Sequence, residues 1–170
     1  MAKPTNNRIL RNVYGKAVAM AVLIAAAMLI LPCCQHKPVM THSRFVHLPP
    51  SGWLRSVPLT FIPEYDATDK TYDISLAFRH DNTYPYRNLS LVVDIIAADS
   101  AVSRRAMEIE FADEYGNWKG RGFGALYQDT INIVERIDPD DAQCVVVWQA
   151  MEGCDTLRGL VNLGIIVRPL

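Results

Sequence analysis

The first apolar stretch of the chain is one uninterrupted run over residues 17–31. Lys3, Arg8, Arg11 and Lys16 precede it, and no acidic residue does. A basic start followed by an apolar run shorter than the ~20 residues that span a bilayer is typical of a secretory signal. A single-pass membrane anchor is the alternative, but no basic cluster follows the run. The pattern therefore predicts that this segment is removed on export.

From Trp53 onward, apolar and polar residues alternate with a period of two, which is typical of half-buried antiparallel strands. The run over 144–148 is apolar on both faces, which predicts a central strand. Turn-forming residues separate the segments, and no helical stripe of useful length follows the signal. About seven or eight short strands predict an all-β chain, folded as a single antiparallel β-sandwich of jelly-roll-like form. The predicted strands are 57–62, 71–80, 88–98, 103–113, 126–136, 143–151 and 160–168.

Two adjacent cysteines follow the apolar run, in the sequence Leu31-Pro32-Cys33-Cys34. This resembles a lipobox, where a bacterial lipoprotein precursor is acylated on the cysteine that becomes its N-terminus. If Cys33 were modified, Pro32 would lie at the cleavage point, where its fixed φ and missing N–H suit a protease poorly. Cys34 is therefore the predicted lipidation site, and the bilayer is the first predicted partner.

Residues 34–52 contain three prolines and no sustained periodicity, which predicts a flexible linker behind the lipidated N-terminus. The predicted organisation is a signal peptide over 1–33, this linker, and a β-sandwich domain over 53–170. His36, His42 and His47 fall in the linker. No cysteine or carboxylate lies at ligand spacing from them, so we interpret them as solvated residues and expect no metal and no cofactor.

The charge of the mature chain narrows the choice of partners. Removing residues 1–33 takes away four of the 17 basic residues and none of the 18 acidic ones, leaving 13 positive residues against 18 negative. An acidic chain argues against binding to nucleic acid and against electrostatic binding to anionic lipid, because both need a basic face. Membrane attachment is therefore expected to depend on the acyl chains.

Cys144 and Cys154 remain after cleavage. An exported protein can form a disulfide, but the predicted strand over 143–151 would place Cys144 roughly 20 Å from the following turn. A disulfide needs Cα atoms within about 7 Å. We expect two free thiols.

No specific catalytic constellation appears. His80 lies at a predicted strand end beside Asp81, and we interpret it as a surface turn residue, because the chain has no nucleophile elbow. The aspartates at 138, 140 and 141 lack the glycine and glutamate of a calcium loop and are interpreted as turn formers. Glu108 and Glu110 share one strand face roughly 7 Å apart, a spacing found in glycosidases. Because they alternate with apolar residues, we interpret them as the solvent-exposed face of an ordinary strand.

The most unusual segment is 116–124, in which four glycines surround Trp118, Lys119, Arg121 and a phenylalanine. Glycine is used where φ is positive or another backbone comes close. Trp118 is either a stacking platform of a binding loop or a plug over the sandwich edge, and the plug is slightly favoured. Tyr84 and Tyr86 flank Pro85 in a second rigid aromatic turn, which is a candidate for a cis bond.

These segments together resemble a known family over essentially all of residues 53–170. They are Phe78-Arg79, Tyr84-Pro85-Tyr86-Arg87-Asn88-Leu89, Gly116-Asn117-Trp118-Lys119-Gly120-Arg121-Gly122, and Gln149-Ala150-Met151 with Leu157-Arg158-Gly159-Leu160-Val161-Asn162-Leu163-Gly164. In this order they resemble the gliding-motility-associated lipoprotein GldH family. The resemblance implies a non-catalytic role in envelope machinery linked to gliding and type IX secretion, with other envelope lipoproteins or secretion proteins as partners.

Two function classes remain open. One is an interaction lipoprotein on the periplasmic side of the envelope, most simply at the outer membrane. The periplasmic side is favoured because Gln35-His36-Lys37 lacks the acidic residues that resemble a surface-export signal. The other is a carbohydrate-binding sandwich of nutrient uptake, which needs an accessible aromatic such as Trp118 or Tyr86. A hydrolase is the least supported class. Three Asp-(Ser/Thr)-apolar triplets also resemble an O-glycosylation pattern, and Ser100 is the predicted site.

The lipid anchor gives the first prediction. We expect that Cys34→Ala abolishes acyl incorporation and strands or releases the precursor, because the linker has no amphipathic helix to hold it at a membrane. Metabolic labelling with palmitate, followed by fractionation, measures both effects. The comparison variant is Cys33→Ala, and loss of label in this variant alone would assign lipidation to Cys33 instead.

Overall fold

A computed structural model describes residues 20, 41–66 and 71–170. The chain divides into two compact units, Met1–Pro38 and Val39–Leu170. Met20, the one described residue of the first unit, is helical and exposed. Among the described residues, no helix has the length and apolar character to cross a bilayer. The predicted signal peptide and Cys34 lie outside the described residues and stay predictions.

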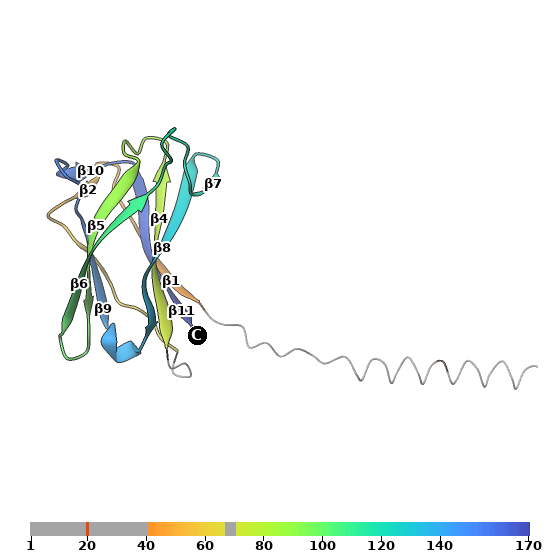
Figure 1. The fold of residues 1–170 in the computed structure, drawn as a ribbon, viewed down its shortest axis with the longest axis vertical. Helices are drawn as coiled ribbons and strands as arrows, with labels where there is room; N and C mark the ends of the chain where they lie inside the picture. Colours follow the sequence, from red (N-terminus) through yellow and green to blue (C-terminus); the bar gives the residue numbers. More distant parts are fainter. Residues whose placement is uncertain (1–19, 21–40, 67–70) are drawn as a thin grey trace, which may run out of the picture. The chain divides into compact units, whose positions relative to one another are not determined.

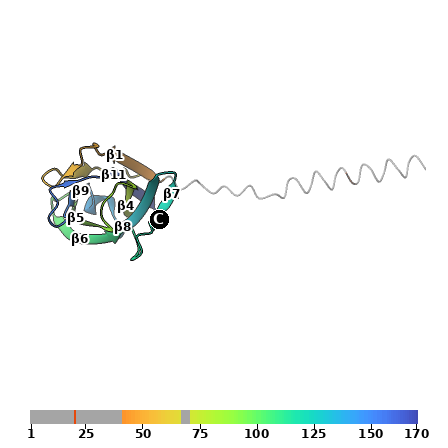
Figure 2. The same cartoon turned by 90° about the horizontal axis from the view of Figure 1, so that it is seen from above.

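Two antiparallel sheets form the second unit (Figures 1 and 2). The five-stranded sheet has the order β1 (His42–His47), β11 (Leu160–Pro169), β4 (Tyr72–Asp81), β8 (Leu126–Ile137) and β7 (Arg121–Phe123). The four-stranded sheet has the order β3 (Leu59–Phe61), β9 (Cys144–Gln149), β5 (Asn88–Ile96) and β6 (Val102–Glu110). A two-stranded ribbon pairs β10 (Thr156–Leu157) with β2 (Trp53–Leu54), and a 3-10 turn covers Pro139–Asp141.

The strand order is that of a jelly roll. With β7 and the ribbon set aside, the remaining strands taken in chain order lie as first, eighth, third and sixth in one sheet, and second, seventh, fourth and fifth in the other. This is the arrangement of two Greek keys wound into a double sheet. The antiparallel sandwich predicted from the alternation is confirmed.

The core lies between the two sheets and consists of the inward-facing positions of the alternation. Ile74, Leu76 and Phe78 of β4 are fully buried. β9 lies between β3 and β5, as the apolar run predicted. Its residues Val145 and Val147 are fully buried, while the alternate positions Cys144, Val146 and Trp148 are half-buried. Because the side-chain period of a strand is two, this register fixes which residues face outward on each strand.

Strand β1 lies in the stretch that the sequence predicted to be a flexible linker. It pairs with β11 from His42↔Val167 to His47↔Asn162, so the expectation of a linker is wrong for these residues. The alternation is hard to see here because β1 is an edge strand and its burial pattern is irregular. The long β11 supplies the partner backbone, and this pairing overrides weak local propensity.

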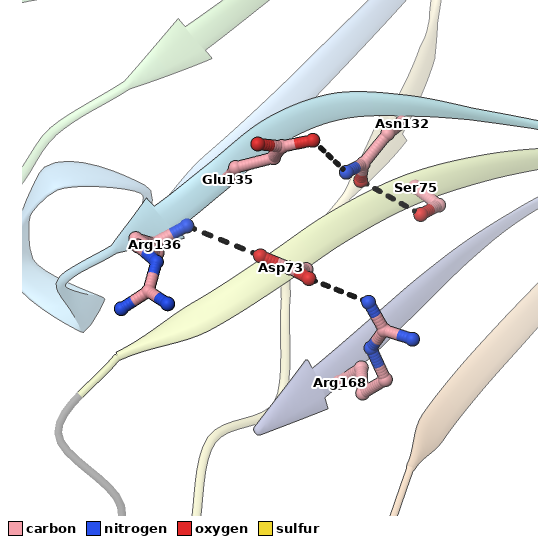
Figure 3. A network of polar contacts seen from close by, with 6 residues as sticks. All are labelled: Asp73, Ser75, Asn132, Glu135, Arg136 and Arg168. Atoms are coloured by element: carbon pink, nitrogen blue, oxygen red, sulfur yellow. Dashed lines mark hydrogen bonds and ion pairs between the residues drawn. The ribbon is translucent and has the colours of Figure 1, made fainter. Parts of the chain in front are cut away.

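The carboxylate of Asp73, at the N-terminal end of β4, is bonded to residues of the two neighbouring strands (Figure 3). Asp73 accepts a 2.6 Å hydrogen bond from Arg168 Nη2 and a 3.2 Å hydrogen bond from the backbone N–H of Arg136. The β4–β8 register shifts beside Asp73, and Arg136 has φ 51°, so Asp73 takes up an N–H at this irregularity. The hydrogen bond from Arg168 holds the pKa of Asp73 below its usual range.

At the other end of β4, Gly159 permits a close approach between two segments that are distant in sequence. Its φ is +80°, and a Cβ at this position would overlap the backbone of Tyr84. The Tyr84–Tyr86 turn can therefore rest on the β10–β11 connection only if residue 159 has no side chain.

We expect that Gly159→Ala lowers the free energy of unfolding by about 2–4 kcal/mol, because it combines a left-handed backbone with overpacking. The matched control is Gly153→Ala. Gly153 has a similar φ of +66° and nothing within 4 Å of its added Cβ, so only the smaller backbone cost applies. Urea unfolding measures both variants. Equal losses in the two would show that contact with Tyr84 does not matter.

Candidate functional site

His80 lies at the centre of an aromatic cluster at one end of the sandwich. Its side chain is fully buried, so the expectation of a surface turn residue is wrong. It is stacked between Phe111 and Tyr127, with ring centroids 4.8 and 5.5 Å away. Trp118 lies 4.5 Å and Tyr84 5.6 Å from it. The signal was present in the sequence, because the alternation of β4 continues through position 80 and directs His80 inward.

The imidazole of His80 faces the carboxylate of Asp129 inside this cluster. Nδ1 lies 3.3 Å from the carbonyl oxygen of Asp81, and Nε2 lies 3.6 Å from Asp129 Oδ2. Among the described residues, neither Nε2 nor Oδ2 has a hydrogen-bond partner, since 3.6 Å is too long for one. Burial lowers the pKa of His80 and raises the pKa of Asp129. Both shifts favour the uncharged form of each group.

A hairpin over residues 111–119 brings Trp118 onto His80. The N–H of Lys119 donates to the carbonyl of Phe111 at 2.7 Å, and the Asp113 carboxylate accepts from two backbone N–H groups in the turn. Trp118 is half-buried, and its Nε1 donates to Asn82 Oδ1 at 3.2 Å. The packing of Trp118 against His80 is the one that the plug interpretation expects, and part of the side chain stays exposed.

The Tyr84–Tyr86 turn closes the other side of the cluster. Tyr84 is buried, and its hydroxyl donates to the carbonyl of Asn88 at 2.8 Å. Burial raises the pKa of Tyr84, which therefore stays a neutral donor. Tyr86 is half-buried and meets the edge of the Tyr84 ring. All described peptide bonds are trans, so the candidate cis bond at Pro85 is not present.

A cavity of about 760 Å³ opens on the outer face of the five-stranded sheet next to this cluster. Arg79, Lys119 and Arg121 line it, together with Asp129 and polar side chains of β8 and β11. Lys119 forms an ion pair with Glu110 of β6. The sequence singled out Lys119 and Arg121 but missed the contribution of Arg79, because only the strand register places Arg79 beside them.

The other candidate residues do not join this site. The Asn88 side chain donates to Glu108 at 2.5 Å, so Glu108 and Glu110 are both engaged by neighbours. Ser100 is exposed with φ 68° in the β5–β6 turn, and its glycosylation stays a prediction. Cys144 and Cys154 are free.

The histidines of the predicted linker do not make a metal site where they are described. His42 lies 3.2 Å from Asp66 and 3.7 Å from Glu64. Over 41–66 and 71–170 there is no cluster of three or more His, Cys, Asp or Glu side chains suited to a metal ion. His36 lies outside the described residues.

The family model described as GldH lipoprotein matches residues 40–167. The chain belongs to the GldH lipoprotein family. It is 27% identical over 150 residues to a Flavobacterium johnsoniae protein named gliding motility lipoprotein GldH, covering 84% of this chain and 91% of that one. It is 26% identical over 144 residues to a Christiangramia forsetii protein named gliding motility lipoprotein GldH homolog, covering 80% and 86%.

Among solved structures, the chain is similar to that of Tomato aspermy virus. The sequence identity is 11%, the TM-score is 0.40, and the match covers 91% of this chain and 94% of that one. The jelly roll of this GldH family member follows from its own strand order.

We expect His80 to titrate below the usual histidine pKa of ~6.5, because burial penalises the cation. Asp129→Asn should lower the pKa of His80 further, because the carboxylate opposite Nε2 favours the protonated ring. NMR titration of the imidazole protons measures both. A rise in the pKa of His80 on Asp129→Asn would contradict the pairing.

The lowered pKa of His80 also makes the free energy of unfolding depend on pH. Between pH ~6.5 and the lower pKa of buried His80, the unfolded chain binds a proton that the folded chain does not, so the free energy of unfolding falls as the pH falls. The raised pKa of Asp129 acts in the opposite direction, at pH values nearer its usual range. His80→Phe should reduce the slope of the free energy of unfolding against pH in this window, which urea unfolding at a series of pH values measures.

Proposed function

We propose that this GldH family member is a non-catalytic interaction lipoprotein of the gliding and type IX secretion machinery. An acylated Cys34 anchors it in a membrane, on the periplasmic side of the envelope and most simply at the outer membrane. Its partners are other envelope lipoproteins or secretion and gliding proteins. The family match over residues 40–167 is the observation that carries the proposal.

The state of the titratable candidates supports a non-catalytic role. A general acid or base has to reach the proton it transfers, and His80 is fully buried beneath aromatic rings. Glu108 and Glu110 are exposed, and they are bonded to Asn88 and Lys119 rather than converging on a shared cleft.

The end of the sandwich that carries the aromatic cluster is the proposed docking surface. The Tyr84–Tyr86 turn and the Trp118 hairpin are far apart in sequence and meet around His80. Buried aromatic packing fixes the position of the chain that follows, from which Lys119 and Arg121 extend outward and exposed. Rigid presentation of cations reduces the ordering cost of binding a partner.

The carbohydrate-binding alternative depends on an accessible aromatic face. Trp118 packs against His80 and Tyr127, and Tyr86 packs against Tyr84. Both side chains are half-buried against neighbouring rings, which weakens the support for a sugar site at these two residues.

Affinity purification from detergent-solubilised envelope tests this function. We expect the variant Lys119→Ala with Arg121→Ala to co-purify fewer envelope proteins at unchanged thermal stability, because the Lys119–Glu110 pair is exposed and adds little to folding. The control is Arg44→Ala with Arg158→Ala, which removes the same charge from two exposed positions outside the cavity. Undiminished co-purification in the first variant would count against docking through these residues.

Trp118→Ala tests whether Trp118 stabilises its own domain or anchors a partner. We expect it to lower the free energy of unfolding, by somewhat less than the ~3–5 kcal/mol of a fully buried tryptophan, since it is half-buried. A normal thermal melt with weakened co-purification would instead make Trp118 a partner anchor.

A further inference from the structure

Five polar or charged residues form a continuous row across the outer face of the five-stranded sheet. Direct cross-strand pairing links them in the order His47, Asn162, Arg79, Gln128 and Arg121, one from each strand. Directly paired residues point to the same face of a sheet. The two arginines are therefore separated by one strand, about 10 Å at the usual strand spacing.

Arg79 is held in a fixed orientation within this row. Its Nε donates to Gln128 Oε1 at 2.9 Å, and its guanidinium carbon lies 4.3 Å from the centre of the Phe45 ring. Phe45 lies directly over Gly164, whose missing side chain leaves room for the ring. An arginine held by stacking and by one N–H keeps its remaining N–H groups available and loses little further freedom when it binds a ligand.

The positive charge of the cavity is only partly matched by its neighbours. Glu110 pairs with Lys119, and Asp129 directs its carboxylate toward His80. Within the described part of the chain, no acidic side chain forms an ion pair with Arg79 or Arg121. This contrasts with residues 34–170 as a whole, in which 18 acidic residues outnumber 13 basic ones. An unmatched pair of guanidinium groups in an acidic protein marks this cavity as an anion site.

We propose that the cavity binds a carboxylate side chain from an acidic segment of a partner protein, between Arg79 and Arg121. The proposal rests on the proposed interaction function and names the chemistry of its docking site. A planar carboxylate accepts paired N–H groups from arginine. Thr130 and Asn162 line the same cavity and supply a hydroxyl and an amide for the neighbouring backbone of the bound segment.

The size and charge of the cavity favour this ligand over other anions. Its volume of about 760 Å³ lies within the range of sites that enclose a small ligand or a few side chains. Two unmatched cations suit one or two carboxylates. Nucleic acid and anionic membranes require a basic face extending over many residues, and the acidic surplus of the chain opposes both.

Fluorescence anisotropy of the full mature lipoprotein in detergent micelles tests the site. The probe is a short labelled peptide of alternating glutamate and glycine, and its control replaces every glutamate with glutamine. We expect only the glutamate peptide to bind, with affinity that falls as salt rises. Arg121→Gln and Arg79→Gln should each weaken binding at least tenfold, since hydrogen bonds to charged groups are the strong ones. Arg44→Gln, at an exposed position on β1, should leave binding unchanged.

Arg121→Gln is the decisive variant, because Arg121 is exposed and its loss does not disturb packing, whereas Arg79 also contacts Phe45. Equal binding of the two peptides, or unchanged binding in both cavity variants, would overturn the proposal. Vesicles containing phosphatidylglycerol form a second arm, and Arg121-dependent binding to them in preference to the peptide would assign the site to lipid. If envelope proteins still co-purify while the peptide does not bind, the carboxylate site fails and the interaction function stands. If the peptide binds and no envelope protein co-purifies, the carboxylate site stands and the interaction function fails.

Discussion

The burial of His80 constrains the whole end of the sandwich around it. An imidazole placed in the core as a cation without a partner would be strongly destabilising. Here the ring is enclosed by Phe111, Tyr127 and Trp118, and it faces Asp129. To supply these neighbours, the chain after β6 has to turn back over the end of the sheet. The hairpin over residues 111–119 supplies two of these neighbours, Phe111 and Trp118.

Gly120 illustrates this dependence. A Cβ at Gly120 would lie 2.5 Å from Asp129 Oδ2, so the chain can pass over the buried pair only as glycine. Immediately beyond this point the chain becomes β7 and brings Arg121 into register with Gln128. The same packing that hides His80 therefore fixes the exposed cations, and the core and the surface of this end form one structural unit.

Much of this fold could be predicted from the sequence, because a period of two is visible wherever one strand face is buried. The alternation located β4, β5 and β6, and the apolar run located the central strand β9. Strand β1 was missed because it forms an edge whose pairing depends on β11. Only part of the candidate site could be predicted from the sequence. Trp118, Lys119 and Arg121 stand out by composition, whereas the place of Arg79 depends on a strand register that no local pattern encodes.

The outer edge of β8 has a consequence for a protein held on a surface. β7 pairs only with residues 126–128 of β8, and the described remainder of that edge continues to Ile137. Arg105 of β6 donates to the carbonyl of Ile133 at 2.8 Å, and the shifts in the β4–β8 register place extra residues, and so bulges, in the same stretch of β8. An exposed and regular edge invites another strand to pair with it. Molecules confined to two dimensions meet far more often than molecules in free solution. A bulged and partly capped edge is a poor template for such pairing, even where copies of the domain are concentrated on one surface.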